Sequence, residues 1–273
     1  QSLPKPEKFH EKMDQLAKRL GLSDPLAERS GSLARYREYL DRSSDWIRRY
    51  HRSGGSGLRV VQCRSIAADV LVQHLHATAT QRIEAETGEA FREVTLLALG
   101  GYGRCELCPN SDIDIMFLYP AKSRSRKFPE IQRIYNDTIL YALWDLNLKV
   151  GHSTRTVKEA LAEADEEDQS KNALMEARWI IGNEALHKRF VREFSRFLRR
   201  DNLQAYLKQR LRDQADRRTK QGGTVFVQEP DIKNGVGGLR DFQSLLWMTR
   251  LQYNGESLRD LVSLDLLRPK EEA

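Results

Sequence analysis

The stretch LLALGGYGRCELCPNSDIDIMFLYP, residues 96–120, decides the fold class of this 273-residue chain. An apolar run ends at Gly100-Gly101, ten residues follow, and Asp112-Ile-Asp114 then opens a second apolar run. Short apolar runs bounded by turn residues predict buried strands. Because alternate residues of a strand point to the same face, Asp112 and Asp114 should present two carboxylates side by side.

Paired carboxylates of this kind suit a divalent cation. Mg²⁺ prefers hard oxygen ligands and is usually held by one or two carboxylates together with substrate phosphates. Such ions stabilise the attacking and leaving oxygens of an in-line displacement. A lone Asp-x-Asp or a lone Gly-Gly is common in ordinary turns. The two in this order, between strand-like flanks, make Asp112 and Asp114 candidate catalytic residues and metal ligands.

The loop before the aspartates has the composition of a phosphate-binding turn. Gly100 and Gly101 allow a sharp turn that brings backbone N–H groups against a phosphate. Arg104 and the hydroxyl of Ser111 are further candidate donors. We therefore expect this loop to bind a triphosphate.

Apolar spacing along the chain predicts an α/β core between helical regions. The expected helices of the first ninety residues span 7–20, 24–51 and 58–86. The expected core comprises strands at 94–99, 113–119 and 149–153 and a helix at 128–148. Beyond residue 156 we expect helix as far as Gly222-Gly223, a short strand at 225–227 and a helix at 239–253.

The composition is that of a protein without membrane spans. No apolar run approaches the ~18 residues that a membrane-spanning helix needs, and three cysteines favour a reducing cytoplasm. Cys105 and Cys108 form Cys-x-x-Cys without a second pair, which disfavours structural zinc. The net charge of +6 suits an anionic ligand without choosing among nucleotides, nucleic acids, lipids and acidic proteins. Because the chain begins with Gln1, we expect it to be part of a longer protein.

Several motifs together resemble the signatures of the bacterial PII uridylyltransferase family, within the polymerase-β-like nucleotidyltransferase superfamily. The resemblance covers about residues 94–250 and adds little for the helical first ninety. The sequence departs from the family at Cys105, where Gly is usual, and at Cys108, where His is usual. The matching segments are GGYGR at 100–104, SDIDI at 111–115, LWDLNLKVGHSTRT at 143–156, LMEARWIIGN at 174–183 and EPDIKNGVGGLRDFQSLLW at 229–247.

The resemblance implies an α+β fold, with a polymerase-β-like nucleotidyltransferase core of a small mixed sheet and helices, flanked by helical N-terminal and C-terminal regions. It implies a helix for the segment at 174–183. The expected parts are a helical N-terminal region at 1–90, the nucleotidyltransferase core at 91–160, and a helical region at 161–273 that completes the nucleotide site and stops before a hydrolase domain.

The second signature supplies further candidates for nucleotide binding. Lys233 and Arg240 could contact phosphate or base, and Gly237-Gly238 opens a helix whose N–H groups favour an anion. A glycine turn with a helix cap is the alternative. His152 stands where related enzymes often place a third acid, and either contacts substrate or hydrogen-bonds inside the core.

The resemblance also implies a function: Mg²⁺-dependent transfer of UMP from UTP to a tyrosine of a PII-type signal protein, with release of pyrophosphate, in nitrogen regulation. The choice of UTP over ATP, and of the acceptor, rests on the resemblance alone. Full-length family members also remove UMP and sense glutamine. Because the chain has no His-Asp dipeptide, we expect the removal activity to be missing here.

Two alternatives belong to other classes. A nucleotidyltransferase acting on RNA or a small molecule would use the basic charge, although basic residues interleaved with aromatics, as on a nucleic-acid-binding surface, are not evident. A non-catalytic nucleotide-binding regulatory module is disfavoured because both aspartates are present.

Overall fold

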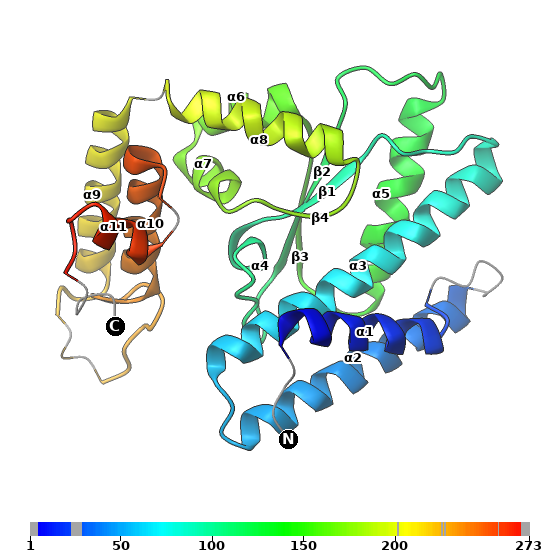
Figure 1. The fold of residues 1–273 in the computed structure, drawn as a ribbon, viewed down its shortest axis with the longest axis horizontal. Coiled ribbons are helices and arrows are strands. Elements are labelled where there is room, and N and C mark those ends of the chain that lie inside the picture. Colours follow the sequence, from blue (N-terminus) through cyan, green and yellow to red (C-terminus); the bar gives the residue numbers. More distant parts are fainter. Residues whose placement is uncertain are drawn as a thin grey trace. The chain divides into compact units, whose positions relative to one another are not determined.

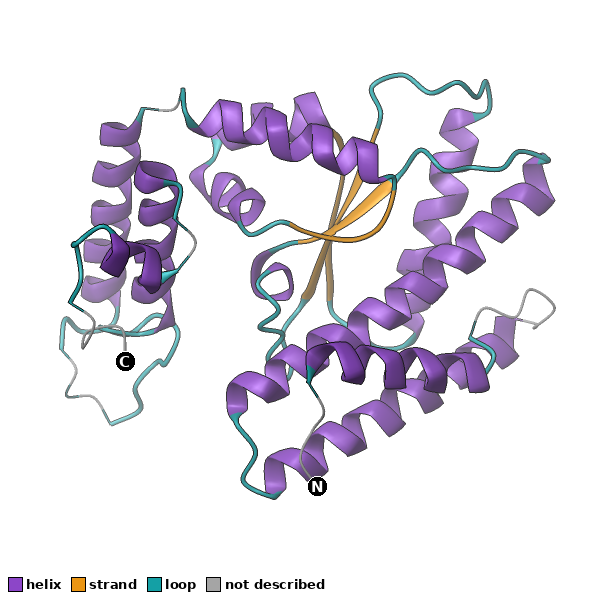
Figure 2. Ribbon diagram, viewed as in Figure 1, coloured by secondary structure: helices purple, strands orange, loops and turns teal. Residues whose placement is uncertain are grey.

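The computed structural model describes residues 5–22, 29–200, 202–224, 226, 228–255 and 257–268. The chain divides into two compact units, Gln1–Val191 and Arg192–Ala273. The first unit contains a four-stranded sheet with helices on both faces, and the described part of the second is helical (Figures 1 and 2).

Along the described part of the chain, successive strands are separated by helices. In order they are α1 (Pro6–Arg19), α2 (Arg29–Arg52), α3 (Gly57–Thr87), β1 (Thr95–Ala98), α4 (Gly100–Gly103), β2 (Ile113–Tyr119), α5 (Phe128–Asp145), β3 (Val150–Thr156), α6 (Val157–Glu166), α7 (Asp168–Met175), β4 (Arg178–Gly182), α8 (Glu184–Leu198), α9 (Leu203–Lys220), α10 (Leu239–Tyr253) and α11 (Leu258–Ser263).

The N-terminal helices form where the apolar spacing predicts them. Helix α1 buries Phe9, Met13 and Ala17, one residue per turn, against the rest of the unit. Helix α3 has buried side chains along most of its length, from Val60 to Thr87, and Gly88, whose φ is 72°, is its left-handed C-cap. The helix expected at 24–51 is observed from Arg29, and its first residues lie outside the described ranges.

The sheet is mixed, with strand order β3-β2-β1-β4. Strand β1 is antiparallel to β2 and β4, and β2 is parallel to β3. Alternation along β2 gives the sheet two buried faces: Ile115 and Phe117 belong to the main core, and Met116 is buried on the other side. Helices α3 and α5 lie on one side of the sheet and α6 and α7 on the other (Figure 1). The expected α+β fold with a small mixed sheet is confirmed.

One expected element is wrong. The segment at 174–183 is not a helix, because α7 ends at Met175 and β4 spans Arg178–Gly182. Aromatic and β-branched side chains favour extended backbone there, and pairing with β1 satisfies its peptide groups. At Gly182, φ is 104° and an added Cβ would lie 2.3 Å from the Val94 carbonyl oxygen. The sheet therefore continues beyond residue 160, where we expected the core to end.

The second unit packs α9 against α10. Tyr206 and Trp247 are buried, and Arg217 donates to Asp241 at 2.9 Å between the two helices. Helix α10 has the bounds expected from the sequence, whereas only Phe226 of the strand expected at 225–227 lies within the described residues. None of the helices described in either unit has the length and apolar character needed to cross a membrane.

Candidate active site

The two aspartates lie at the start of β2, in the middle of the sheet. Asp112 directly precedes the strand and is exposed, and Asp114 is its second residue and half-buried. The backbone here is fixed on both sides. The Ile113 N–H donates to the Lys149 carbonyl at 2.8 Å, and the Leu99 N–H donates to the Asp114 carbonyl at 2.9 Å. The end of β1 and the start of β3 therefore both lie next to the aspartate pair.

Two glycines make room for the Asp114 carboxylate. A Cβ added at Gly100 would lie 3.2 Å from Asp114 Oδ2, and one added at Gly151 would lie 2.2 Å from Asp114 Oδ1. Gly151 pairs with Asp114 in the parallel β2–β3 register. The carboxylate thus lies between two stretches of backbone that carry no side chain. Sequence reasoning missed Gly151, although a glycine inside a strand pattern signals close approach of another group.

The glycine-rich loop forms a single helical turn, α4, at the end of β1. Gly103 N–H donates to the Leu99 carbonyl at 2.9 Å, and Arg104 N–H donates to the Gly100 carbonyl at 3.0 Å. Cys105 then adopts a φ of 59°, in the left-handed region that costs a side-chain-bearing residue roughly 1–2 kcal/mol. A glycine would adopt this φ without that cost.

Arg104 has two carboxylate partners within the chain. Its Nε donates to Glu106 Oε2 at 2.7 Å, and its Nη1 lies 2.7 Å from Glu176 Oε1, whose side chain is 8% exposed. Burial lowers the pKa of the guanidinium, but the two glutamates outweigh it and raise the pKa overall. These contacts hold Arg104 beside Gly101. A contact between Arg104 and a triphosphate stays a prediction, as does one from the exposed Ser111.

His152 does not lie beside the aspartates. It pairs with Ile115, whereas the preceding residue, Gly151, pairs with Asp114. Neighbouring residues of a strand point to opposite faces, so His152 and Asp114 lie on opposite faces of the sheet. The imidazole is exposed and meets the Trp144 ring edge-on, with centroids 5.8 Å apart. The structure therefore places His152 neither inside the core nor as a third group next to Asp114.

The second signature forms a compact turn in the second unit. Asp231 accepts hydrogen bonds from the backbone N–H groups of Lys233 at 2.8 Å and Asn234 at 2.9 Å. These bonds and the Asn234 side chain hold the pKa of Asp231 below its ordinary value. A Cβ added at Gly238 would lie 2.7 Å from the Ile232 carbonyl oxygen, so the turn closes tightly. The Lys233 side chain is exposed.

Helix α10 begins directly after this turn. Asp241 in its first turn accepts from the Gly237 N–H at 3.1 Å and from Arg217 at 2.9 Å. Partial burial raises the pKa of Asp241, but these hydrogen bonds lower it overall. The guanidinium of Arg240 lies over the Trp247 ring, 5.4 Å from its centroid. Nucleotide binding by Lys233, Gly237, Gly238 and Arg240 stays a prediction.

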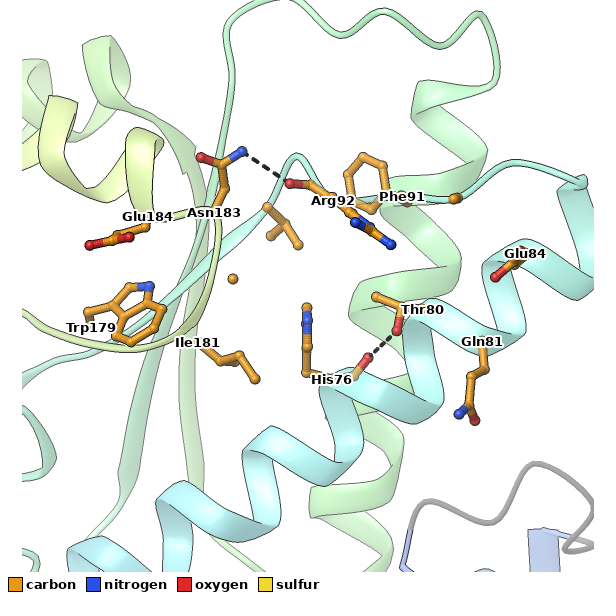
Figure 3. Close-up of a pocket in the computed structure, with 13 residues that line it drawn as sticks. His76, Thr80, Gln81, Glu84, Phe91, Arg92, Trp179, Ile181, Asn183 and Glu184 are labelled. Atoms are coloured by element: carbon orange, nitrogen blue, oxygen red, sulfur yellow. Dashed lines mark hydrogen bonds between the residues drawn. The ribbon is translucent and has the colours of Figure 1, made fainter. Parts of the chain in front are cut away.

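A hollow of about 610 Å³ lies elsewhere in the first unit, between α3, residues 90–94 and β4 (Figure 3). Figure 3 shows His76 and Thr80 of α3 facing it from one side and Trp179 and Asn183 from the other. Neither aspartate lines it. Gly182, at the end of β4, lines the hollow and pairs with Thr95 at the start of β1. The hollow therefore lies toward the start of β1, away from the glycine turn that follows its end.

The aspartate pair fits a magnesium ion that the substrate helps to hold. Among the described residues no group of three or more His, Cys, Asp or Glu side chains could hold a metal ion by itself. Asp112 and Asp114 could supply two hard oxygen ligands, and Mg²⁺ in such sites takes its remaining ligands from substrate phosphates and water.

Taken together, a mixed sheet flanked by helices, paired aspartates opening a central strand, and a glycine turn at the end of its neighbour define a nucleotidyltransferase-type domain. Sequence comparison narrows this class. The chain matches the family described as GlnD PII-uridylyltransferase over residues 205–273.

Three curated relatives are named bifunctional uridylyltransferase/uridylyl-removing enzyme. The protein of Azospirillum brasilense is 33% identical over 97% of this chain and 28% of its own length. The proteins of Rhodospirillum rubrum and Phenylobacterium zucineum are 33% and 30% identical, over 81% and 91% of this chain and 23% and 26% of their own lengths. The chain belongs to this uridylyltransferase family and spans about a quarter of the length of these relatives. The match to the Azospirillum brasilense protein also takes in the helical N-terminal region, which lies outside the segments that carry the resemblance.

Proposed function

We propose that this chain is a Mg²⁺-dependent uridylyltransferase domain that transfers UMP from UTP to a tyrosine of a PII-type signal protein. The observation that carries the proposal is the Asp114 carboxylate, held between Gly100 and Gly151 and preceded by the exposed Asp112. The names of the relatives support the uridylyl group, and the family description supports a PII protein as acceptor.

The step that the site performs is a substitution at phosphorus. The phenolic oxygen of the acceptor forms a bond to the α-phosphorus of UTP, the bond to the bridging oxygen of the β-phosphate breaks, and pyrophosphate leaves. When bound, Mg²⁺ would neutralise charge on the triphosphate and on the leaving group. The phenolic proton passes to water or to a carboxylate such as Asp114.

The chain's own residues orient the nucleotide. Asp112 and Asp114 would hold the metal ion beside β2, where it would neutralise charge on the triphosphate. The glycine turn lets the triphosphate approach the backbone, because no side chain projects from Gly100 or Gly101. The first N–H groups of a helical turn have no carbonyl partner within it, so those that open α4 can donate to phosphate oxygens.

Label transfer tests the proposal. The protein is incubated with Mg²⁺, a PII-type protein and UTP or ATP labelled at the α-phosphate, and Asp112→Ala and Asp114→Ala are compared with wild type. We expect label on the acceptor from UTP only, and its loss in both variants. Asp137→Asn, which changes an acid of α5 remote from β2 in sequence, is the control and should transfer normally.

The other outcomes point to different functions. Transfer from ATP alone would contradict the assignment of UTP. Mg²⁺-dependent nucleotide binding without transfer to a PII-type protein would contradict the acceptor and favour an RNA or small-molecule acceptor, or a regulatory module.

A further inference from the structure

An ion pair with a buried aspartate and a partly exposed arginine lies directly against the glycine turn. Arg178, the first residue of β4, donates to both carboxylate oxygens of Asp69 in α3, from Nη1 at 2.9 Å and from Nη2 at 3.0 Å. The two residues are 109 positions apart in sequence. The Asp69 side chain is 12% exposed and that of Arg178 is 27% exposed. A fork of two parallel bonds fixes the plane of the guanidinium.

The same guanidinium holds the backbone of α4. Its Nε donates to the Gly103 carbonyl at 3.2 Å, and its Nη2 donates to the Tyr102 carbonyl at 3.2 Å. Carbonyls at the end of a helical turn lack partners within the turn and carry partial negative charge. Arg178 therefore gives the Gly103 carbonyl a donor and adds a further donor to the Tyr102 carbonyl, which also accepts from the Cys105 N–H at 3.2 Å. Asp69 keeps the guanidinium aimed at both carbonyls.

The turn is also closely packed at Gly103. A Cβ added at Gly103 would lie 2.2 Å from the Glu176 carbonyl oxygen and 2.9 Å from that of Ala98. At the other end of the turn, Gly100 borders the space that the Asp114 carboxylate occupies. A shift of α4 at Gly103 would therefore be transmitted to the space in which the carboxylate lies.

We propose that Asp69 and Arg178 are a positioning pair that sets the glycine turn against Asp114 for nucleotide transfer. The inference rests on the proposed function for its catalytic consequence. Neither side chain touches the nucleotide; Arg178 acts through the Tyr102 and Gly103 carbonyls, and Asp69 acts through Arg178. The burial, the two-pronged geometry and the backbone contacts all serve the position of the turn.

Arg178→Lys is the main test, because it keeps the positive charge and removes the fork. A lysine ammonium cannot reproduce two parallel bonds to a carboxylate while also reaching two carbonyls. The matched control is Arg155→Lys. Arg155 lies on β3 of the same sheet, contacts Glu163 at 2.9 Å and has a similarly exposed side chain, at 24%. Arg155 pairs with Leu118, near the end of β2 opposite to the aspartates.

Two readouts are measured on each variant. Hydrogen exchange of the peptide covering residues 99–106 should be faster in Arg178→Lys, above all at the amides of Gly103 and Arg104, and unchanged in Arg155→Lys. The kcat of uridylyl transfer should fall by about 10- to 100-fold in Arg178→Lys, with a smaller change in the KM for UTP, since misplaced groups cost turnover. Asp69→Asn should lower kcat in the same direction and add little when combined with Arg178→Lys.

Two results would overturn the positioning role. One is exchange and kcat in Arg178→Lys equal to those of Arg155→Lys. The other is faster exchange spread evenly over the whole first unit, which would mean that the pair only stabilises the fold. If the wild type transfers no UMP, the proposed function fails, and exchange at residues 99–106 still decides whether the pair holds the turn.

Discussion

The Asp114 carboxylate occupies a space defined by what its neighbours lack. Gly100 and Gly151 come from different segments of the chain, and a methyl group at either would enter the carboxylate's volume or touch it. The closer approach is at Gly151, where an added Cβ would lie 2.2 Å from Oδ1. Asp114 is therefore positioned by absent side chains as much as by the hydrogen bonds of its own backbone.

Replacing Gly151 by alanine should displace the carboxylate and leave the fold intact. Its φ is not in the left-handed region, so Ala fits the backbone, and the atom it meets is the end of a side chain that can rotate. We expect kcat to fall roughly 100-fold through misplacement of the ligand. The free energy of unfolding should change by less than about 1 kcal/mol. Transfer assays and urea unfolding measure the two effects.

Gly57→Ala is the matched control for this substitution. An added Cβ at Gly57 meets nothing within 4 Å, and Gly57 is the first residue of α3, so the variant should keep both turnover and stability. Wild-type turnover in Gly151→Ala would show that the Asp114 carboxylate does not need its observed position.

Residues of the site differ in how far the sequence can reveal them. Asp112, Asp114 and the glycine pair are close in sequence, so their spacing alone predicts their meeting. Arg178 and Asp69 are 109 positions apart in sequence, and no local pattern predicts their contact. Arg104 is a similar case, because its pairing with Glu176 depends on how α7 packs near α4.

Among the elements, α3 connects the N-terminal helices to the sheet. It packs against α1, α2, α5 and β4. It contributes Asp69 to the ion pair with Arg178 that contacts the glycine turn. It also contacts α5 through His76, whose Nδ1 lies 2.5 Å from the Tyr135 hydroxyl. Stability of this helix should therefore be coupled to stability of the site.

Burial lowers the pKa of His76 to about 4, which makes the first unit sensitive to acid. The unfolded chain binds this proton near its ordinary pKa of 6.5, and the folded chain binds it only near 4. The unfolded state therefore binds more protons between these values, so stability is full above 6.5 and falls as the pH drops toward 4. At about pH 5 the loss attributable to His76 should be about 2 kcal/mol relative to about pH 7.5.

Urea unfolding of His76→Gln at both pH values measures this contribution. The variant should lose most of the His76 share of the pH dependence, although burial lowers the pKa of His74 and His187 in the same direction and will leave a remainder. His51→Gln, which changes an exposed histidine of α2, should keep the wild-type dependence. An unchanged dependence in His76→Gln would contradict the assignment.

The sequence predicts an element well where the apolar residues of a segment follow one regular spacing. Strand β2 and helix α10 have the expected bounds because each has an uninterrupted pattern and a clear glycine or aspartate at its start. Strand β4 differs from the expected helix because its five residues follow α7 after only Glu176 and Ala177, and because its strand character depends on pairing with β1. A short apolar run of this length is compatible with helix or strand until its neighbours are known.

At the scale of the whole molecule, the chain combines a sheet-bearing unit that holds the aspartates with a second unit that holds Lys233 and Arg240. The relatives that resemble it are about four times longer, so its activity as a separate chain is the point on which the account depends. The net charge of +6 is consistent with a triphosphate substrate and does not by itself identify one.

The most direct test is the intact mass of a PII-type signal protein after incubation with this protein, UTP and Mg²⁺. The account predicts a gain of one uridylyl group per modified subunit, located on a tyrosine, with the wild type and with Asp137→Asn, and no gain with Asp114→Asn. The same gain with Asp114→Asn, or none with a wild type that binds UTP, would contradict it.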